Sequence, residues 1–253
     1  MAAKLNRRRL DLLLVERNLA DSRQKAQAMI LAGEVEVDGQ RADKAGLSIS
    51  ESASIEVHSR LQKYSSRGGF KLEGALEDFN VNPLGKVCLD IGSSTGGFTD
   101  CLLQHGAARI FAVDVNTDQL AWKLREDSRV LRIKKNAREL SSQDLTELVD
   151  LVVADVSFIS VKKIIPGALA CAKPGADLLI LIKPQFELER GDVGKSGIVR
   201  EPALHEKAIA SVRQAAESLG LIGLRISPSR LAGTEGNQEY FLHARKPPAV
   251  EST

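Results

Sequence analysis

Two apolar segments of the sequence are each followed directly by a charged residue. Asp155 follows the segment 148–154, and Lys183 follows the segment 178–182. In an open sheet of parallel strands, residues at the carboxyl ends of the strands face the crevice in which ligands bind. A carboxylate and an ammonium group at that edge can orient a substrate and take up or stabilise a charge, so we interpret the pair as a candidate catalytic site.

A glycine-rich segment indicates a cofactor site beside this pair. The sequence from Asp90 to Phe98 follows the predicted strand 86–91 and opens a helix, and Asp114 ends the next strand. The spacing G-x-x-x-G-G differs from the dinucleotide pattern, and no Walker lysine follows it. An acid, a glycine loop and a second acid that can bind ribose hydroxyls are typical of S-adenosylmethionine-dependent methyltransferases. The alternative is an ordinary glycine-rich turn in which Asp114 only caps a helix.

Ten residues of this region are predicted to bind the cofactor. Asn136, after the third strand, is the weakest of them, because a polar residue at a strand end is often only part of a turn. The set is Asp90, Gly92, Ser93, Ser94, Gly96, Gly97, Phe98, Asp114, Asn136 and Asp155.

These residues belong to an alternation of strands and helices that begins near residue 85. Such an alternation predicts an α/β fold with a mostly parallel, doubly wound, Rossmann-like sheet. The expected strands are 86–91, 109–113, 130–133, 148–154, 178–182, 221–227 and 239–244. The expected helices are 98–105, 118–125, 162–172 and 202–219.

The first 62 residues read as a separate, small α+β module. Helical spacing of Leu10, Leu13 and Leu14 predicts one short helix, and a second is expected to bury Ala26, Met29 and Ile30. Asp21 or Ser22 can cap this second helix, and Gly33 can end it. Strands are expected at 34–37 and 53–57, with a hairpin turn at Asp38-Gly39. The boundary to the second domain, residues 63–253, is expected at about 62–66.

The charge of the chain is unevenly distributed. The net charge is only +2, but residues 1–71 contain 13 Lys+Arg against 9 Asp+Glu, and residues 72–253 contain 22 against 24. A basic excess at one end indicates contacts with nucleic-acid phosphates, although for residues 7–9 a solvated tail is the alternative. The predicted contacts are Arg7, Arg8, Arg9, Arg23 and Lys25.

Composition excludes several other classes of protein. Among the 253 residues, 43% are hydrophobic and 27% are charged, as in ordinary globular proteins. The apolar runs are too short for a membrane helix, and no secretory signal is visible. Three cysteines without metal-ligand spacing predict no metal site and a reducing, cytoplasmic setting.

Several motifs together resemble a known family. The segments 9–14, 22–26 and 33–39 look like an S4 RNA-binding domain. Those at 66–72, 90–100, 155–160, 183–187 and 236–240 resemble the FtsJ-like ribosomal-RNA 2′-O-methyltransferase domain. In this order and length, the chain is similar to the TlyA/hemolysin A family of ribosomal-RNA cytidine-2′-O-methyltransferases.

The resemblance implies a cofactor, a partner and four catalytic residues. S-adenosyl-L-methionine would supply the methyl group, and ribosomal RNA or a ribosomal subunit would accept it, with no membrane and no obligatory protein partner. The catalytic tetrad of the family falls on Lys71, Asp155, Lys183 and Glu239. By composition alone, Lys71 and Glu239 look like surface charges.

The chemistry of the tetrad leaves two roles open for Lys183. A ribose hydroxyl is too weak an acid to ionise at neutral pH, so Lys183 can accept its proton as a general base or stabilise the developing alkoxide as an ammonium ion. Asp155 would orient Lys183, while Lys71 and Glu239 would position the lysine and the ribose. Phe158 or Phe186 can stack on the target base, but we favour a core position for each.

Two functions of other classes compete with this interpretation. One is a non-catalytic ribosome- or RNA-binding protein that keeps a degenerate methyltransferase fold. The other is a hemolysin-type membrane-active protein, which the short apolar runs disfavour. The target nucleotide, the ribosomal subunit that carries it and the oligomeric state do not follow from the sequence.

Overall fold

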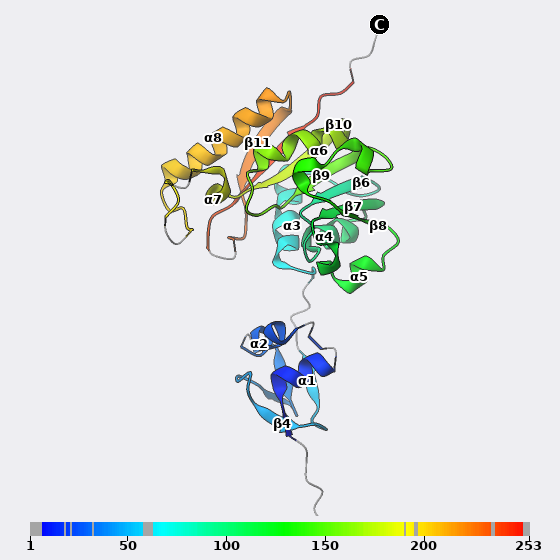
Figure 1. Cartoon of the computed structure of the whole chain (residues 1–253), viewed down its shortest axis with the longest axis vertical. Helices are drawn as coiled ribbons and strands as arrows, with labels where there is room; N and C mark the ends of the chain where they lie inside the picture. Colours follow the sequence, from blue (N-terminus) through cyan, green and yellow to red (C-terminus); the bar gives the residue numbers. More distant parts are fainter. Residues whose placement is uncertain are drawn as a thin grey trace, which may run out of the picture. The chain divides into compact units, whose positions relative to one another are not determined.

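A computed structural model describes residues 7–17, 19–20, 22–31, 33–57, 63–189, 191–194, 197–233 and 236–249. The chain forms two compact units, residues 1–63 and 64–253 (Figure 1). The predicted helix cap Asp21 and Gln62, the start of the predicted joining segment, lie outside the described residues. No helix among the residues described could span a membrane.

The first unit is a small α+β domain built around the leucines of its first helix, as predicted. Leu10, Leu13 and Leu14 are buried together with Ala26 and Ile30 in one apolar cluster. The helices are α1 (Leu10–Glu16) and α2 (Arg23–Leu31). The strands are β1 (Arg7–Arg9), β2 (Val35–Val37), β3 (Gln40–Arg41), β4 (Ser48–Ser50) and β5 (Ile55–Val57).

Local turn chemistry in this unit follows the sequence expectations. The backbone N–H of Lys25 donates to the Ser22 hydroxyl over 3.2 Å, so Ser22 caps α2. Asp38 and Gly39 both have positive φ (50° and 78°), which is the conformation of a two-residue hairpin turn, and they join β2 to β3. β1 and β4, which the sequence did not indicate, pair in a separate two-stranded sheet.

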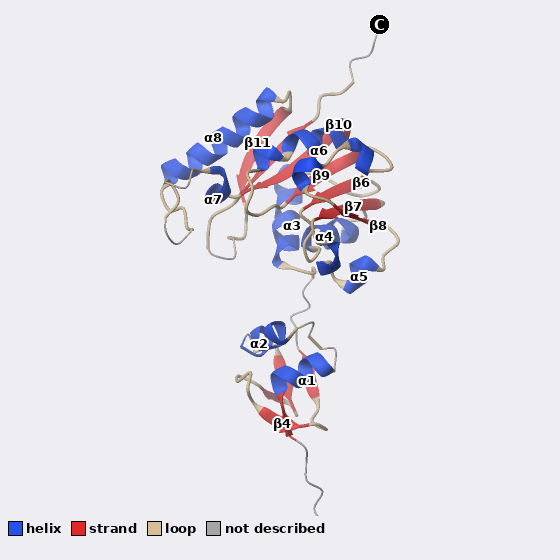
Figure 2. Cartoon of the chain, in the orientation of Figure 1, coloured by secondary structure: helices blue, strands red, loops and turns tan. Residues whose placement is uncertain are grey.

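The second unit contains one seven-stranded sheet in the order β11-β12-β10-β9-β6-β7-β8 (Figure 2). The five strands from β10 to β8 are parallel, and β12 runs antiparallel between β10 and β11. The mostly parallel sheet that the sequence predicts is therefore confirmed. The strands are β6 (Val87–Ile91), β7 (Arg109–Asp114), β8 (Val130–Lys134), β9 (Val149–Ala154), β10 (Ala172–Ile182), β11 (Ile222–Pro228) and β12 (Tyr240–Arg245).

Helices cover both faces of this sheet (Figure 2). The helices α6 and α8 pack on one face and α3, α4 and α5 on the other, so each face has its own apolar cluster. The helices are α3 (Arg67–Phe79), α4 (Gly97–Gln104), α5 (Trp122–Arg125), α6 (Ile165–Cys171), α7 (Pro184–Glu187) and α8 (Pro202–Ser218). Burial on both faces explains why the central strands are continuous apolar runs.

Two predicted helices are wrong as single elements. The segment 118–125 is a 3-10 turn, η1 (Thr117–Gln119), followed by α5, with Leu120 extended between them. Leu120 is buried, and its side chain and that of Leu124 lie where a Cβ on Gly96 would be. Packing on the glycine loop therefore outweighs helical propensity here. The predicted helix 162–172 likewise divides into the 3-10 turn η4 (Val161–Lys163) and α6.

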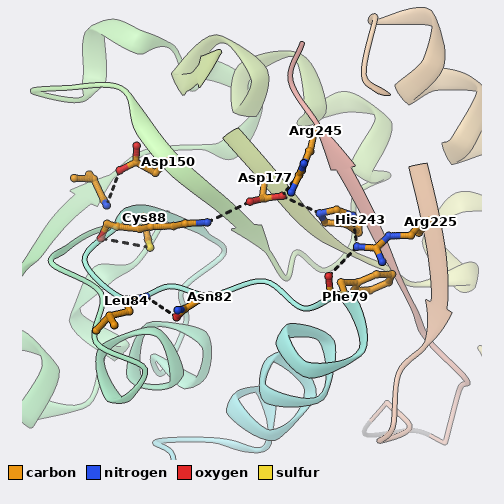
Figure 3. Close-up of polar contacts among 11 residues, drawn as sticks. Phe79, Asn82, Leu84, Cys88, Asp150, Asp177, Arg225, His243 and Arg245 are labelled. Carbon is orange, nitrogen blue, oxygen red and sulfur yellow. Dashed lines mark hydrogen bonds and ion pairs between the residues drawn. The ribbon is translucent and has the colours of Figure 1, made fainter. Parts of the chain in front are cut away.

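A polar network around the buried carboxylate of Asp177 joins the starts of the parallel strands to β11 and β12 (Figure 3). Asp177 Oδ1 accepts hydrogen bonds from His243 Nε2 and Arg245 Nε, each over 3.0 Å, and Oδ2 accepts one from Lys86 over 3.2 Å. Arg225 lies 3.2 Å from Nδ1 of His243 and donates to the carbonyl of Phe79. These bonds tie the antiparallel strands to the parallel part of the sheet, at the end opposite to the predicted site.

Candidate active site

The glycine-rich loop after β6 depends on close backbone packing. Gly92 has a φ of +85°, and a Cβ at this position would lie 2.3 Å from the carbonyl oxygen of Asp155. Ser94 has a positive φ of 48° without being glycine, and its N–H donates to Asp114 Oδ2 over 2.9 Å. The loop therefore lies directly against the end of β9 and the end of β7.

A cavity of about 610 Å³ opens in front of this loop. Five of the ten predicted cofactor residues line it: Gly92, Ser94, Asp114, Asn136 and Asp155. The other five are not among its lining residues: Asp90, Ser93, Gly96, Gly97 and Phe98. Phe98 is buried instead and stacks on Phe241, with 6.1 Å between the ring centroids.

The sequence analysis missed other residues of this cavity. Val115, Lys135 and Arg138 also line it, and the side chain of Val115 is largely exposed. The signal for the basic residues was present, because seven of the seventeen residues from 122 to 138 are Lys or Arg. Val115 was detectable only as the residue that follows the strand-end acid Asp114.

Asp90 is completely buried behind the loop. Its Oδ2 accepts a hydrogen bond from the Thr99 hydroxyl over 2.6 Å, whereas Oδ1 has no hydrogen-bond partner among the described residues. The pKa of Asp90 is raised to about 7, mainly by burial; the Thr99 hydrogen bond opposes this rise, and the negative charges of Asp155 and Asp114 add to it. Near neutral pH this carboxyl group is therefore poised between its two charge states.

The polar atoms of the loop fit S-adenosylmethionine. Besides Asp90 Oδ1, the hydroxyl oxygen of Ser93 is buried without a partner among the described residues. Unpaired buried polar groups are costly, so these atoms suit a ligand that supplies donors and acceptors, as the amino-acid end of the cofactor does. Asp114 suits ribose hydroxyls, and Val115 provides an apolar surface for an adenine ring.

The four predicted catalytic residues form two ion pairs. Lys183 Nζ lies 2.5 Å from Asp155 Oδ1 and donates to the Ser157 hydroxyl over 2.9 Å. Lys71 Nζ, from α3, lies 2.5 Å from Glu239 Oε2, and both side chains are less than 10% exposed. Charges this deeply buried are stable only when paired, so neither Lys71 nor Glu239 is an ordinary surface charge.

Strand register brings the two pairs to one place. Ile182 of β10 pairs with Tyr240 of β12, so the next residues outward, Lys183 and Glu239, are neighbours at the end of the sheet. Both line a second cavity of about 430 Å³. Ser157 and Phe158 line this cavity as well as the first one, so the two cavities adjoin beside Asp155 and Lys183.

Phe158 does not occupy the core position that we favoured from the sequence. Its side chain is 88% exposed, and its φ is +64°, a conformation that non-glycine residues seldom adopt. The Phe186 ring, which is half-buried, lies 5.3 Å away between centroids. An exposed aromatic ring held by a strained backbone at the junction of two cavities indicates a contact surface rather than a packing residue.

The predicted RNA-contact residues lie on the surface of the first unit. A buried carboxylate organises two of them, because Asp11 accepts hydrogen bonds from Arg9 (3.0 and 2.9 Å) and Arg23 (3.0 Å), and also from Gln27. The hydrogen bond from Arg9 is the main reason that the pKa of Asp11 lies well below its usual value. Both guanidinium groups remain about half exposed, so two positive charges share one carboxylate and keep a net positive charge.

The other three residues have different surroundings. Arg7 donates to the Ser48 carbonyl, and Arg8 forms ion pairs with Glu16 and Glu51. Lys25 is exposed on α2.

Comparisons with known proteins match both units. The model of the FtsJ-like methyltransferases matches residues 64–246, and the S4 domain model matches residues 8–55. The 16S/23S rRNA (cytidine-2′-O)-methyltransferase TlyA of Mycobacterium tuberculosis is 44% identical over 94% of this chain and 90% of its own length. Hemolysin A of Brachyspira hyodysenteriae is 42% identical over 93% and 98%. The structure of a putative hemolysin from Streptococcus thermophilus superposes with a TM-score of 0.75, at 38% identity, over 98% of this chain and 92% of the other.

The charge state of Asp90 predicts how cofactor affinity depends on pH. Since S-adenosylmethionine is cationic, it favours the ionised carboxylate, so its affinity should rise between about pH 6 and pH 8 and fall as pH drops through the pKa of about 7. Asp90→Asn should weaken binding about tenfold at pH 8 and remove this pH dependence. Isothermal calorimetry over this pH range measures both effects.

Thr99→Val is the matched variant. It removes the hydrogen bond that lowers the pKa of Asp90, so the midpoint of the affinity curve should move above pH 7. An affinity that is independent of pH in the unmodified protein would contradict this role for Asp90.

Proposed function

This chain belongs to the FtsJ-like methyltransferases that carry an N-terminal S4 domain, and we propose that it transfers a methyl group from S-adenosylmethionine to the ribose 2′-hydroxyl of a cytidine in ribosomal RNA. The adjoining cavities at the end of the sheet support this proposal most directly. One has the acid–glycine loop–acid frame of a cofactor site, and the other contains the buried lysine and glutamate of the tetrad. A donor and an acceptor bound on either side of Ser157 and Phe158 would meet beside Lys183.

The residues of the tetrad would act mainly on the hydroxyl group. The cofactor supplies a methyl group that is already activated, so the protein has to align the acceptor and manage its proton. The ammonium group of Lys183, in close contact with Asp155, would stabilise the negative charge that develops on the 2′-oxygen. Asp155 holds this ammonium group in place and, as a carboxylate, is a group to which the released proton can pass.

Lys71 and Glu239 would act as positioning residues. The Lys71–Glu239 pair anchors the start of β12 to α3, and Glu239 lines the acceptor cavity. A buried glutamate whose second oxygen faces the cavity region near Gly233 can accept a hydrogen bond from a ribose hydroxyl. This arrangement would fix the sugar with its 2′-oxygen toward Lys183.

Phe158 would hold the base of the target nucleotide. Reaching a 2′-hydroxyl in folded RNA requires the nucleotide to leave its stack, and an exposed aromatic ring can replace the lost stacking. Phe158 has this exposure, and Phe186 supports it from the side of the acceptor cavity. We propose stacking on Phe158 as the reason that its strained backbone is kept.

The first unit would position the RNA. Its S4 domain carries the Asp11-centred arginine pair and the neighbouring basic side chains, which can contact phosphates without reading the base sequence. We propose ribosomal RNA within a ribosomal subunit as the partner and the cytoplasm as the location. No obligatory protein partner enters this proposal.

Replacement of the central lysine tests the function. Lys183→Ala should reduce methyl transfer to ribosomal RNA at least about 1,000-fold, because it removes the charge that stabilises the alkoxide, while S-adenosylmethionine binding stays within about threefold. Radiolabelled methyl transfer to ribosomal subunits measures the first quantity and calorimetry the second. Lys207→Ala, at an exposed ion pair on α8, is the control and should behave like the unmodified protein. Near-normal turnover by Lys183→Ala would refute the assignment.

The arginine pair of the S4 domain predicts a salt effect. Replacing Arg9 and Arg23 together by Gln should weaken binding to ribosomal subunits and reduce the slope of log K against log salt by about 0.7 to 0.9 per lost phosphate contact. Filter binding over a series of KCl concentrations measures the slope. Arg213→Gln, which removes an exposed arginine of α8, is the control. An unchanged slope in the double variant would show that this pair does not touch phosphate.

A further inference from the structure

One amide in the acceptor cavity is left without hydrogen bonds. Gln185 lies in α7, two residues after Lys183, and its side chain lines the 430 Å³ cavity. The Oε1 atom is buried and has no hydrogen-bond partner among the described residues. A buried acceptor without a donor is destabilising, so Oε1 suits a ligand that supplies the donor.

Two neighbouring polar side chains have partners within the protein. Asn237, in the same cavity wall, accepts from the Val199 N–H over 2.8 Å and donates to the Gly197 carbonyl over 2.9 Å. Glu187, in the same helix as Gln185, accepts from the Ser160 hydroxyl and the Val161 N–H. The amide oxygen of Gln185 therefore differs from these two neighbours, which are both paired within the protein.

The position of Gln185 in the cavity suits a contact with the base of the target nucleotide rather than with its sugar. Lys183 and Glu239 are the charged groups of the cavity, and Phe158 and Phe186 are its aromatic groups. If the 2′-hydroxyl lies at Lys183 and the base stacks on Phe158, the polar edge of the base extends over the residues between them. Gln185, between Lys183 and Phe186 in the chain, is a neutral polar side chain of this cavity whose buried acceptor is unpaired among the described residues.

We propose that Gln185 selects cytosine, which deepens the proposed function and rests on it. The buried Oε1 accepts a hydrogen bond from the exocyclic amino group of cytosine, and the amide N–H donates to the ring nitrogen beside it. Uracil has a carbonyl oxygen where cytosine has the amino group, so two acceptors would face each other. If the Gln185 amide rotated by about 180° so that its NH₂ group donated to the uracil carbonyl, this NH₂ group would occupy the buried position of Oε1. One of its two N–H groups would then be buried without an acceptor.

The test compares two substrates and two variants. Ribosomal RNA transcripts that carry cytidine or uridine at the methylated position are assayed for radiolabelled methyl transfer. The unmodified protein should prefer cytidine by at least about tenfold in kcat/KM, because a site that pairs a polar group rejects an analogue lacking it. Gln185→Leu should lose about 10- to 100-fold on cytidine and reduce the preference to near unity. Gln214→Leu, on the exposed face of α8, is the control.

The experiment distinguishes failure of the Gln185 inference from failure of the proposed function. Calorimetry with S-adenosylmethionine shows whether Gln185→Leu is folded, and the comparison of cytidine with uridine on the unmodified protein needs no variant. Equal transfer to both bases by the unmodified protein, or an unchanged preference in folded Gln185→Leu, would overturn the inference and leave the proposed function intact. If the unmodified protein transfers no methyl group to either transcript or to ribosomal subunits, the proposed function fails, and the inference fails with it.

Discussion

The site depends on a lysine ammonium group and a carboxylate that two buried strands hold against each other. Lys183 Nζ and Asp155 Oδ1 are 2.5 Å apart, and the strand residues that precede each of them are completely buried. Bringing charges to such a place costs solvation free energy that only a close partner offsets, so each residue requires the other. The parallel pairing of β9 with β10 guarantees that the two strand ends meet, and the antiparallel β12 adds Glu239 to the same edge.

A second constraint is the backbone of the glycine loop. At Gly92 a side chain would collide with the Asp155 carbonyl, and at Gly96 it would collide with Leu120 and Leu124. The loop of the predicted cofactor site is consequently packed against the chain segment that begins the candidate catalytic site. The proposed donor and acceptor cavities share Ser157 and Phe158, and a change in the loop backbone would alter the position of Asp155.

Much of this architecture could be predicted from periodicity and turn chemistry. The buried strands are apolar runs in the sequence, and the glycines mark turns whose backbone conformation is set locally. The helix α3 was not predicted, although Leu72, Ala75, Leu76 and Phe79 repeat at helical spacing. The burial of Lys71 within this helix was therefore not predicted either. Tertiary packing decided the rest: Leu120 breaks the helix expected at 118–125 to cover Gly96, and a positive φ turns Phe158 outward. Neither effect has a signal within the segment itself.

The pairing of Lys71 with Glu239 illustrates the same limit. These residues are 168 positions apart, and each looks like a surface charge in its own segment. Only the resemblance to a family singled them out, and only the fold shows that both are buried and in contact. Sequence patterns indicate strand ends well, whereas pairs formed across the sheet need the three-dimensional arrangement.

The central claim, that this chain methylates a ribose hydroxyl of a cytidine in ribosomal RNA, can be tested directly in cells. Ribose 2′-O-methylation is mapped at nucleotide resolution across ribosomal RNA from cells with the intact gene and from cells without it. The account predicts at least one cytidine whose 2′-O-methylation is present in the first and absent in the second, and restored by the intact gene but not by one encoding Lys183→Ala. Identical methylation maps in the two cell lines would contradict it.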